Sequence, residues 1–336
     1  MIISAQQRIG LIAASAVAAL IAIVAVWLSR APPAPEPLTI AVSNSLIGVP
    51  LWVADRQGFF AAEGLSVTLH RLPSGKLALE AMLRGEAQVA TLAETPLVFA
   101  ALAGKPLRVI ATYAASGEHA IVARADRGIS QVADLRGRRV GVIVGTSAQY
   151  FLHVMLSDQG LAETDITLVD LPAREQAAAL AAGRVDAVAT FAPFTTQCRR
   201  AMGEAARTFP MGLRYRGYTS LAVAPDLPER RPEAIRRLLR ALERAIGWMR
   251  MHPREAMQVA TTELNVEDAV VAETWQRLGF NLAVDQGFVM LLQSEAQWAI
   301  ASGLAAGRTV PDFPAMIDAA ILAGLRPGSV TVTAQP

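Results

Sequence analysis

Short β-rich runs alternate with helical runs along most of this chain, and glycines close many of the helical runs. LTIAVS at 38–43 predicts a strand, the following helix spans about 50–57, and Gly58 ends it. This alternation is typical of a parallel sheet with crossover helices. The further strands predicted in this part are 65–70, 87–92 and 107–113, and its further helices are 74–84 and one that begins at Thr95.

The same order begins again after Gly117. The stretches AMLRGEAQVATLAETP (81–96) and ALAAGRVDAVATFAP (179–193) each contain a helix end, a glycine, a strand and a proline-started helix. One supersecondary unit is thus used twice, which predicts an α/β protein with two lobes. The strands predicted for the second lobe are 120–124, 139–145, 166–171 and 185–191, with a helix at 174–182.

Beyond Pro225 the sequence predicts an almost entirely helical tail. In RRPEAIRRLLRALERAIGWMR (230–250) the apolar residues recur at helical spacing and form one stripe, while three arginines fall on another face. We interpret the basic face as solvated and the tail's tryptophans as core residues. The further helices expected are 254–263, 267–278, 286–302 and 314–323.

An uncharged apolar run precedes these elements. Gly10–Leu28 holds 19 residues, close to the roughly 20 that a helix needs to cross a bilayer. We expect residues 1–30 to be an uncleaved membrane anchor, with a cleaved secretory signal as the alternative. Residues 31–37 (APPAPEP) predict a proline-rich extended spacer. The folded part would then lie outside the cytoplasm, in the periplasm or on the extracytoplasmic face of the membrane.

Composition removes several classes of function. The net charge is +2, from 31 basic and 29 acidic residues, so no nucleic-acid partner is expected. Cys198 is the single cysteine and permits no internal disulfide. The histidines are widely separated, with no metal-ligand spacing, and no sequence motif calls for a cofactor.

The loop GVIVGTSAQ at 141–149 invites an enzymatic interpretation, but no enzyme motif fits it. It lacks the lysine of a phosphate-binding loop, the glycines of a dinucleotide fingerprint and the last glycine of a nucleophile elbow. Thr146 and Gln149 instead form a capping-box pattern, and Gly145 would let the backbone approach a ligand closely. Unpaired N–H groups at such a helix start favour a small anion, although an ordinary cap without a ligand fits the pattern equally well.

Other candidate binding residues follow predicted strands, at the edge where open parallel sheets bind ligands. Glu94 would repel an anion, so it either neutralises an amine on a zwitterion or caps its helix with Thr95. Phe191, Tyr218 and Trp52 are candidates for apolar walls or for core. The complete set of candidate ligand-binding residues is Asn44, Ser45, Ser74, Gly75, Glu94, Thr95, His119, Gly145, Thr146, Ser147, Phe191 and Tyr218.

Five stretches carry a family resemblance by their order and spacing. They are PLWVADRQGFFAAEGLSVTL (50–69), LRGEAQVA (83–90), GKPLRVIAT (104–112), DLRGRRVGVIVGTSAQYFL (134–152) and AAGRVDAVATFAPF (181–194). Together they resemble the substrate-binding proteins of ABC importers for nitrate, aliphatic sulfonates and taurine. The likeness extends from residue 38 to about 327.

That resemblance implies a two-lobed type II periplasmic-binding-protein fold, in which each lobe is a mixed, mostly parallel sheet with flanking helices. Lobe 1 would comprise 38–118 and 221–336, and lobe 2 would comprise 119–220. The family's solute contacts helix N-termini, at positions that match Ser74, Thr95, Thr146 and Ser147. Lobe closure is then sensed by a membrane permease.

We therefore expect a non-enzymatic, extracytoplasmic protein that binds an oxyanion or a zwitterion and partners an ABC permease. The alternatives are an enzyme on the same fold, such as a relative that makes thiamine pyrimidine, and a sensory input domain. The pyrimidine-making relatives use a cysteine-rich motif, which the lone Cys198 cannot supply.

Overall fold

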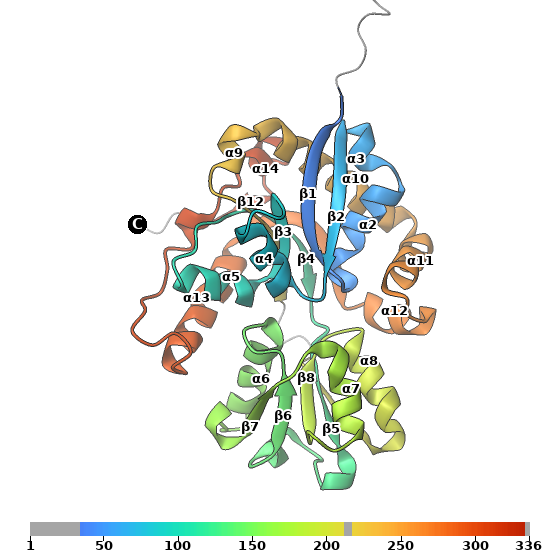
Figure 1. The fold of residues 1–336 in the computed structure, drawn as a ribbon, viewed down its shortest axis with the longest axis vertical. Helices are drawn as coiled ribbons and strands as arrows, with labels where there is room; N and C mark the ends of the chain where they lie inside the picture. Colours follow the sequence, from blue (N-terminus) through green and yellow to red (C-terminus); the bar gives the residue numbers. More distant parts are fainter. Residues whose placement is uncertain (1–33, 212–216, 333–336) are drawn as a thin grey trace, which may run out of the picture. The chain divides into compact units, whose positions relative to one another are not determined.

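The computed structural model describes residues 34–211 and 217–332 (Figure 1). The expected membrane anchor, 1–30, lies outside these residues. Within the described part of the chain, no helix is long and apolar enough to cross a bilayer. The spacer expected at 31–37 ends early, because the first strand already begins at Glu36, where its backbone N–H donates to the carbonyl of Gly64.

A seven-stranded sheet forms the centre of the larger lobe, in the order β12-β11-β4-β10-β3-β1-β2. Strand β10 is antiparallel to both of its neighbours, β3 and β4, and it returns the chain to this sheet after the smaller lobe. The strands are β1 (Glu36–Ser43), β2 (Leu65–Leu72), β3 (Val89–Ala93), β4 (Arg108–Ser116), β10 (Gly217–Val223), β11 (Leu278–Asp285) and β12 (Val330–Thr331).

The smaller lobe contains a five-stranded sheet in the order β7-β6-β8-β5-β9. Its strands are β5 (Ala120–Arg124), β6 (Arg139–Val142), β7 (Thr167–Asp170), β8 (Ala187–Thr190) and β9 (Ala206–Pro210). Strand β6 pairs in parallel with β7 and β8, whereas β5 is antiparallel to β8 and β9. The expectation of mixed sheets is therefore confirmed, but antiparallel pairs are as frequent as parallel ones.

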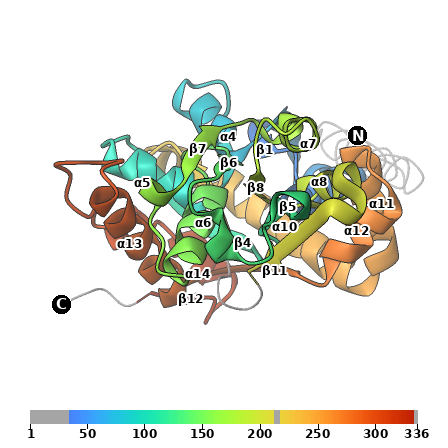
Figure 2. The ribbon, with the colours of Figure 1, turned by 90° about the horizontal axis from the view of Figure 1, so that it is seen from below.

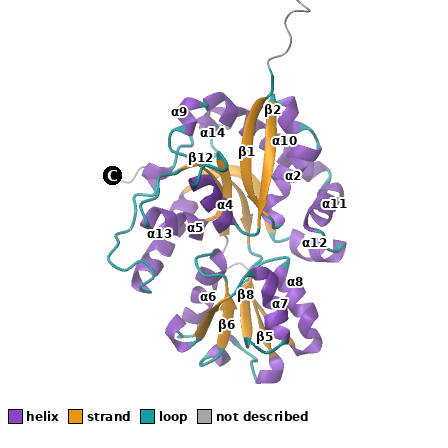
Figure 3. Ribbon diagram, in the orientation of Figure 1, coloured by secondary structure: helices purple, strands orange, loops and turns teal. Residues whose placement is uncertain are grey.

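Helices cover both sheets (Figure 3). In the smaller lobe, α6 lies on one side of the sheet and α7 and α8 lie together on the other (Figures 1 and 2). The helices are α2 (Val49–Arg56), α3 (Phe59–Ala62), α4 (Gly75–Leu83), α5 (Glu94–Leu102), α6 (Ser147–Ser157), α7 (Ala173–Ala181), α8 (Phe194–Met202), α9 (Leu227–Arg230), α10 (Pro232–Met251), α11 (Pro253–Leu264), α12 (Asp268–Trp275), α13 (Gln286–Ala301) and α14 (Ala320–Leu325).

The tail beyond Pro225 is less helical than expected. Residues 278–285 form β11, an eight-residue strand that pairs antiparallel with β4. Leu282 and Val284 alternate with more exposed neighbours and are fully or almost fully buried. The apolar stripe predicted for α10 is confirmed, since Leu238, Leu242 and the other stripe residues are buried.

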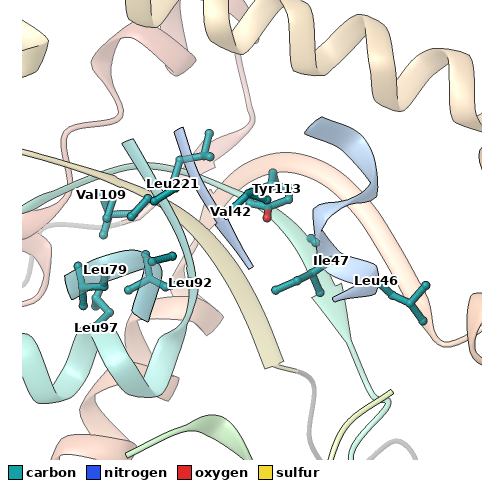
Figure 4. Close-up of a cluster of buried hydrophobic side chains, with 14 of the residues drawn as sticks. Val42, Leu46, Ile47, Leu79, Leu92, Leu97, Val109, Tyr113 and Leu221 are labelled. Carbon is teal, nitrogen blue, oxygen red and sulfur yellow. The ribbon is translucent and has the colours of Figure 1, made fainter. Parts of the chain in front are cut away.

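One apolar cluster joins the strands of the larger sheet to the helices that begin at its edge. Val42 of β1, Leu92 of β3 and Leu221 of β10 are all completely buried. Figure 4 shows them near Leu79 of α4 and Leu97 of α5. Burial of each such side chain contributes about 1.5–3 kcal/mol, so this packing fixes where α4 and α5 begin.

Gly75, at the start of α4, is required for close packing of that helix on β3. A Cβ atom at this position would lie 2.9 Å from the Cα of Leu92 and 3.3 Å from the carbonyl oxygen of Thr91. We predict that Gly75→Ala lowers the free energy of unfolding by about 1–3 kcal/mol, because α4 must shift away from the sheet.

Urea denaturation would measure this effect. Gly247→Ala is the matched control, because a Cβ there meets nothing within 4 Å and lies inside helix α10. The control should stabilise the protein by up to about 1 kcal/mol. Equal denaturation midpoints for the two variants would contradict the packing argument.

Candidate functional site

A cavity of about 50 Å³ lies between the two lobes, and we call it the inner cavity. Both lobes contribute to it, together with the first chain crossing between β4 and β5. Its volume suits a single small polar group rather than a whole large ligand. The lining residues are Ser43, Ser45, Ile47, Ser74, Gly75, Lys76, Ala93, Glu94, Pro96, Ser116, Glu118, His119, Thr146, Ser147, Phe191, Gly217, Tyr218 and Thr219.

A second cavity of about 700 Å³, the outer cavity, shares Ser74 and Lys76 with the inner one. It contains charged groups of both signs from both lobes. Its remaining lining residues are Asn44, Arg71, Leu72, Pro73, Leu77, Glu80, Ile143, Asp170, Pro172, Ala173, Arg174, Phe194 and Glu263. A ligand with its head group in the inner cavity would therefore have room for a longer remainder in the outer one.

Three helix starts face the inner cavity. The hydroxyl of Ser74 caps α4 by accepting the N–H of Leu77 at 3.3 Å. Glu94 and Ser147 are the first residues of α5 and α6, respectively. The unpaired N–H groups of a helix's first turn are donors, and the helix dipole adds a partial positive charge, so these starts suit an oxygen-rich group.

Most of the candidate residues line the inner cavity. Those that do so are Ser45, Ser74, Gly75, Glu94, His119, Thr146, Ser147, Phe191 and Tyr218. Asn44 lines the outer cavity instead, and Gly145 lines a third cavity with Lys76 and Phe99. Trp52, considered as an apolar wall, is a core residue with 1% of its surface exposed.

The prediction that Thr95 faces the solute is wrong. Its side chain is completely buried and lines neither the inner nor the outer cavity. Thr95 directly follows Glu94, the residue that faces the cavity, and its hydroxyl interacts with the carboxyl of Glu295 on α13. The second residue of this helix therefore belongs to the contact with α13.

The predicted capping box at the start of α6 is also wrong. The hydroxyl of Thr146 donates to the carbonyl of Ile143 at 2.7 Å and caps no N–H group. The side-chain oxygen of Gln149 accepts the N–H of Gly145 at 2.9 Å, one residue earlier than the box requires. Gly145 has a φ of +77°, which explains the glycine without a ligand.

Ser147, at the start of α6, and His119, directly before β5, form a buried polar pair at the inner cavity. The hydroxyl of Ser147 lies 3.0 Å from Nε2 of His119, a separation that nucleophilic enzymes also use. Burial lowers the pKa of His119 to about 4, so the imidazole is neutral at pH 7 and a weak base. Because general bases work best with a pKa near the working pH, the pair is suited to hydrogen bonding rather than to proton abstraction.

Glu94 belongs to a network of buried acids. Its Oε2 accepts the backbone N–H of Tyr218 at 3.0 Å, and its carboxyl interacts with that of Glu295. Burial raises the pKa of Glu94 to about 7, and burial together with the nearby Glu94 raises the pKa of Glu295 well above its usual range. Glu295 consequently keeps its proton and donates a hydrogen bond to Glu94, since two like charges this close cannot both persist.

Glu118 is a cavity residue that the sequence interpretation missed. It lies in the crossing between β4 and β5, is only 5% exposed, and has a buried Oε2 without a hydrogen-bond partner among the described residues. Burial raises the pKa of its carboxyl to about 8. Its position immediately before His119, at an expected lobe crossing, is the one signal in the sequence that could have found it.

Lys76 was missed as well. Its Nζ donates to the carbonyl of Val144 in the smaller lobe at 3.2 Å. Among the residues that line the inner cavity, it is the only lysine or arginine. Further contacts join the lobes nearby, since Nε1 of Trp298 donates to Glu163 at 2.9 Å and the hydroxyls of Tyr150 and Ser294 lie 3.0 Å apart. The cavity is therefore seen with the lobes closed around it.

We predict that Glu118 makes stability fall as the pH rises. Because the folded-state pKa of about 8 exceeds the usual glutamate value of 4.5, the folded protein keeps a proton that the unfolded chain releases between these pH values. The stabilisation by Glu118 is fully present below the pKa of the unfolded chain, and it is lost as the pH rises through the pKa of the folded protein. Each unit of difference in pKa corresponds to about 1.4 kcal/mol.

Urea unfolding at pH 5, 6, 7 and 8 would measure this dependence. Glu118→Gln, which mimics the protonated acid, should reduce the loss of unfolding free energy between pH 5 and 8. The control is Glu204→Gln, at an exposed position of the smaller lobe. If Glu118→Gln and the unmodified protein follow parallel pH curves, Glu118 does not hold its proton in the folded state.

Comparison with known sequences identifies proteins that are similar to this chain. The sequence model of the NMT1/THI5-like family matches residues 48–256. A putative aliphatic sulfonates-binding protein of Bacillus subtilis is 26% identical over 243 residues, covering 70% of this chain and 71% of that protein. The taurine-binding periplasmic protein of Escherichia coli is 27% identical over 161 residues, covering 47% and 49%, respectively.

Solved structures share the fold. The alkanesulfonate-binding protein of Xanthomonas axonopodis pv. citri, bound to MOPS, aligns with a TM-score of 0.73 and 21% identity, covering 86% of this chain and 99% of that one. The desulfurization enzyme DSZB aligns with a TM-score of 0.65 and 22% identity, covering 86% and 98%. The fold is therefore that of periplasmic binding proteins, and the enzyme DSZB has the same fold. Since the family's sequence model matches well over half of the sequence, this chain belongs to the NMT1/THI5-like family.

Proposed function

We propose that this protein is the extracytoplasmic solute-binding component of an ABC importer, and that it binds a small anionic or zwitterionic solute of the sulfonate and taurine class. The observation that carries the proposal is the inner cavity between the lobes, lined by helix starts that bear hydroxyl groups. The names of the relatives in Bacillus subtilis and Escherichia coli support the same class of solute.

In this proposal the two lobes open and close around the solute. The larger lobe comprises residues 38–118 and 221–336, and the smaller lobe comprises residues 119–220. The second boundary moves to Gly217, because β10 begins there and pairs in the larger sheet. The contact of Lys76 with Val144 would form only on closure. A permease in the membrane would then recognise the closed form.

Ser74, Thr146 and Ser147 are the residues that we assign to the anionic oxygens. Ser74 and Ser147 are 7% and 6% exposed, and their hydroxyls lie at the starts of α4 and α6, one from each lobe. A solute that receives donors from both lobes stabilises the closed form, because it contacts both helix starts only when they are near each other.

We also propose that the protein is tethered to the membrane through residues 1–30. The proposal rests on the 19 uncharged residues from Gly10 to Leu28 and on the prolines after Ala31, which make a poor cleavage context. A tether would keep the binding protein close to its permease.

Binding of sulfonates is the direct test of the proposed function. We predict that taurine or an alkanesulfonate binds the full chain in a mild detergent, as measured by calorimetry, with nitrate and pyrimidine precursors as comparison solutes. Ser147→Ala should weaken binding by about 1 kcal/mol, because one hydrogen bond to the solute is lost. Binding of pyrimidine precursors alone would overturn the sulfonate assignment, and unchanged affinity of Ser147→Ala would remove that residue from the site.

The tether has its own test. We predict that N-terminal sequencing of the mature protein, isolated from membranes of the producing cells, finds the segment up to Arg30 intact. A mature chain that begins near residue 31 would show instead that the segment is a cleaved secretory signal.

A further inference from the structure

The inner cavity is acidic, although its helix starts suit an anion. Among the described residues that line it, two carry carboxyl groups, Glu94 and Glu118, and Lys76 carries the one ammonium group. Lys76 also lines the outer cavity and donates to Val144, which places it at the boundary between the two cavities. A solute that carries only negative charge would therefore meet two buried acids in the space that encloses its head group.

The two acids differ in how well the protein satisfies them. Glu94 accepts the backbone N–H of Tyr218 and interacts with Glu295, so it has partners within the larger lobe. Glu118 forms no hydrogen bond or ion pair with any described residue, and its Oε2 is completely buried. Burial of this oxygen lowers the free energy of unfolding, because a buried polar group without a hydrogen-bond partner has lost its hydration.

Charged groups on the far side of Glu118 do not supply the missing partner. Glu118 also borders a cavity of about 250 Å³ that is lined by Arg199, Glu273 and Arg277. Arg199 forms an ion pair with Glu273 instead, and no ion pair joins Glu118 to either arginine. No described residue therefore supplies a donor to Oε2 of Glu118.

We propose that the solute carries a protonated nitrogen, and that Glu118 receives this nitrogen in the inner cavity with Glu94 beside it. The inference rests on the proposed function, whose solute class it narrows to zwitterions. The volume of about 50 Å³ fits an ammonium-sized group, while the hydroxyl of Ser74, which lines both cavities, and the mixed charges of the outer cavity serve the anionic end.

Proton release accompanies binding in this scheme. Glu118 holds a proton at pH 7, because burial raises its pKa to about 8, and an ammonium group beside it would favour the charged carboxylate. The proton therefore leaves to the buffer when the solute enters. The other titratable groups of the described residues at the inner cavity are Lys76, Glu94, His119 and Tyr218, and of these Glu94, with a pKa of about 7, would contribute a smaller part of the release.

The test compares taurine with ethanesulfonate, which lacks only the amine, on the full chain in detergent at pH 7. Calorimetry in two buffers with different enthalpies of ionisation measures affinity and proton release together. We expect taurine to bind at least tenfold more tightly than ethanesulfonate and to release up to about one proton, whereas ethanesulfonate should release none. At pH 9, where Glu118 is already ionised, the release by taurine should largely disappear.

Glu118→Gln separates this role from a purely structural one. The variant should fold, because glutamine mimics the protonated acid, and it should lose both the preference for taurine and most of the proton release. Glu204→Gln, at an exposed position, should keep both.

The outcomes distinguish the two proposals. Equal affinity for taurine and ethanesulfonate, or unchanged proton release by Glu118→Gln, would overturn the nitrogen assignment and leave the proposed function standing. Failure of both solutes to bind would overturn the proposed function, and the nitrogen assignment would fall with it.

Discussion

The return of the chain through β10 holds the cavity in place. This strand lies antiparallel between β3 and β4, so the end of the second crossing is locked beside the start of the first. Its residue Tyr218 donates a backbone N–H to Glu94, at the start of α5. A shift of β10 by one residue would turn its side chains to the opposite face and remove this contact. The position of the acid at the base of the cavity therefore depends on the register of one central strand.

The alternation of strands and helices predicted the two-lobed architecture because it reflects local periodicity. Strands that pair with distant partners were harder to find. Residues 278–285 stand between two helical segments, and β11 forms there because the edge of β4 is available to pair with it. Proximity to a strand end likewise identified Ser74 and Ser147, but it could not show that Thr95 turns away toward α13. Side-chain direction at a helix start depends on tertiary packing, which one sequence does not reveal.

The cavity combines two electrostatic tendencies that would conflict around a simple ion. Helix starts attract oxygen-rich groups, whereas buried carboxyl groups attract donors. Glu94 is stabilised by sharing a proton with Glu295, and His119 stays neutral beside Ser147. The protein thus limits the charge in its interior. A ligand that carries a protonated nitrogen can pair that nitrogen with ionised Glu118, while its anionic end meets the helix starts, so each buried charge has a partner of opposite sign.

Closure of the lobes is supported by the protein as well as by the solute. Trp298 donates to Glu163, the hydroxyls of Tyr150 and Ser294 meet, and Lys76 reaches Val144, so several hydrogen bonds within the protein cross between the lobes. Each contributes about 0.5–1.5 kcal/mol to the closed form. Glu118 opposes closure, because closure buries its Oε2, which has no hydrogen-bond partner among the described residues. A solute that supplies the partner removes the opposing cost, so its differential affinity for the closed form arises largely at that one carboxyl group.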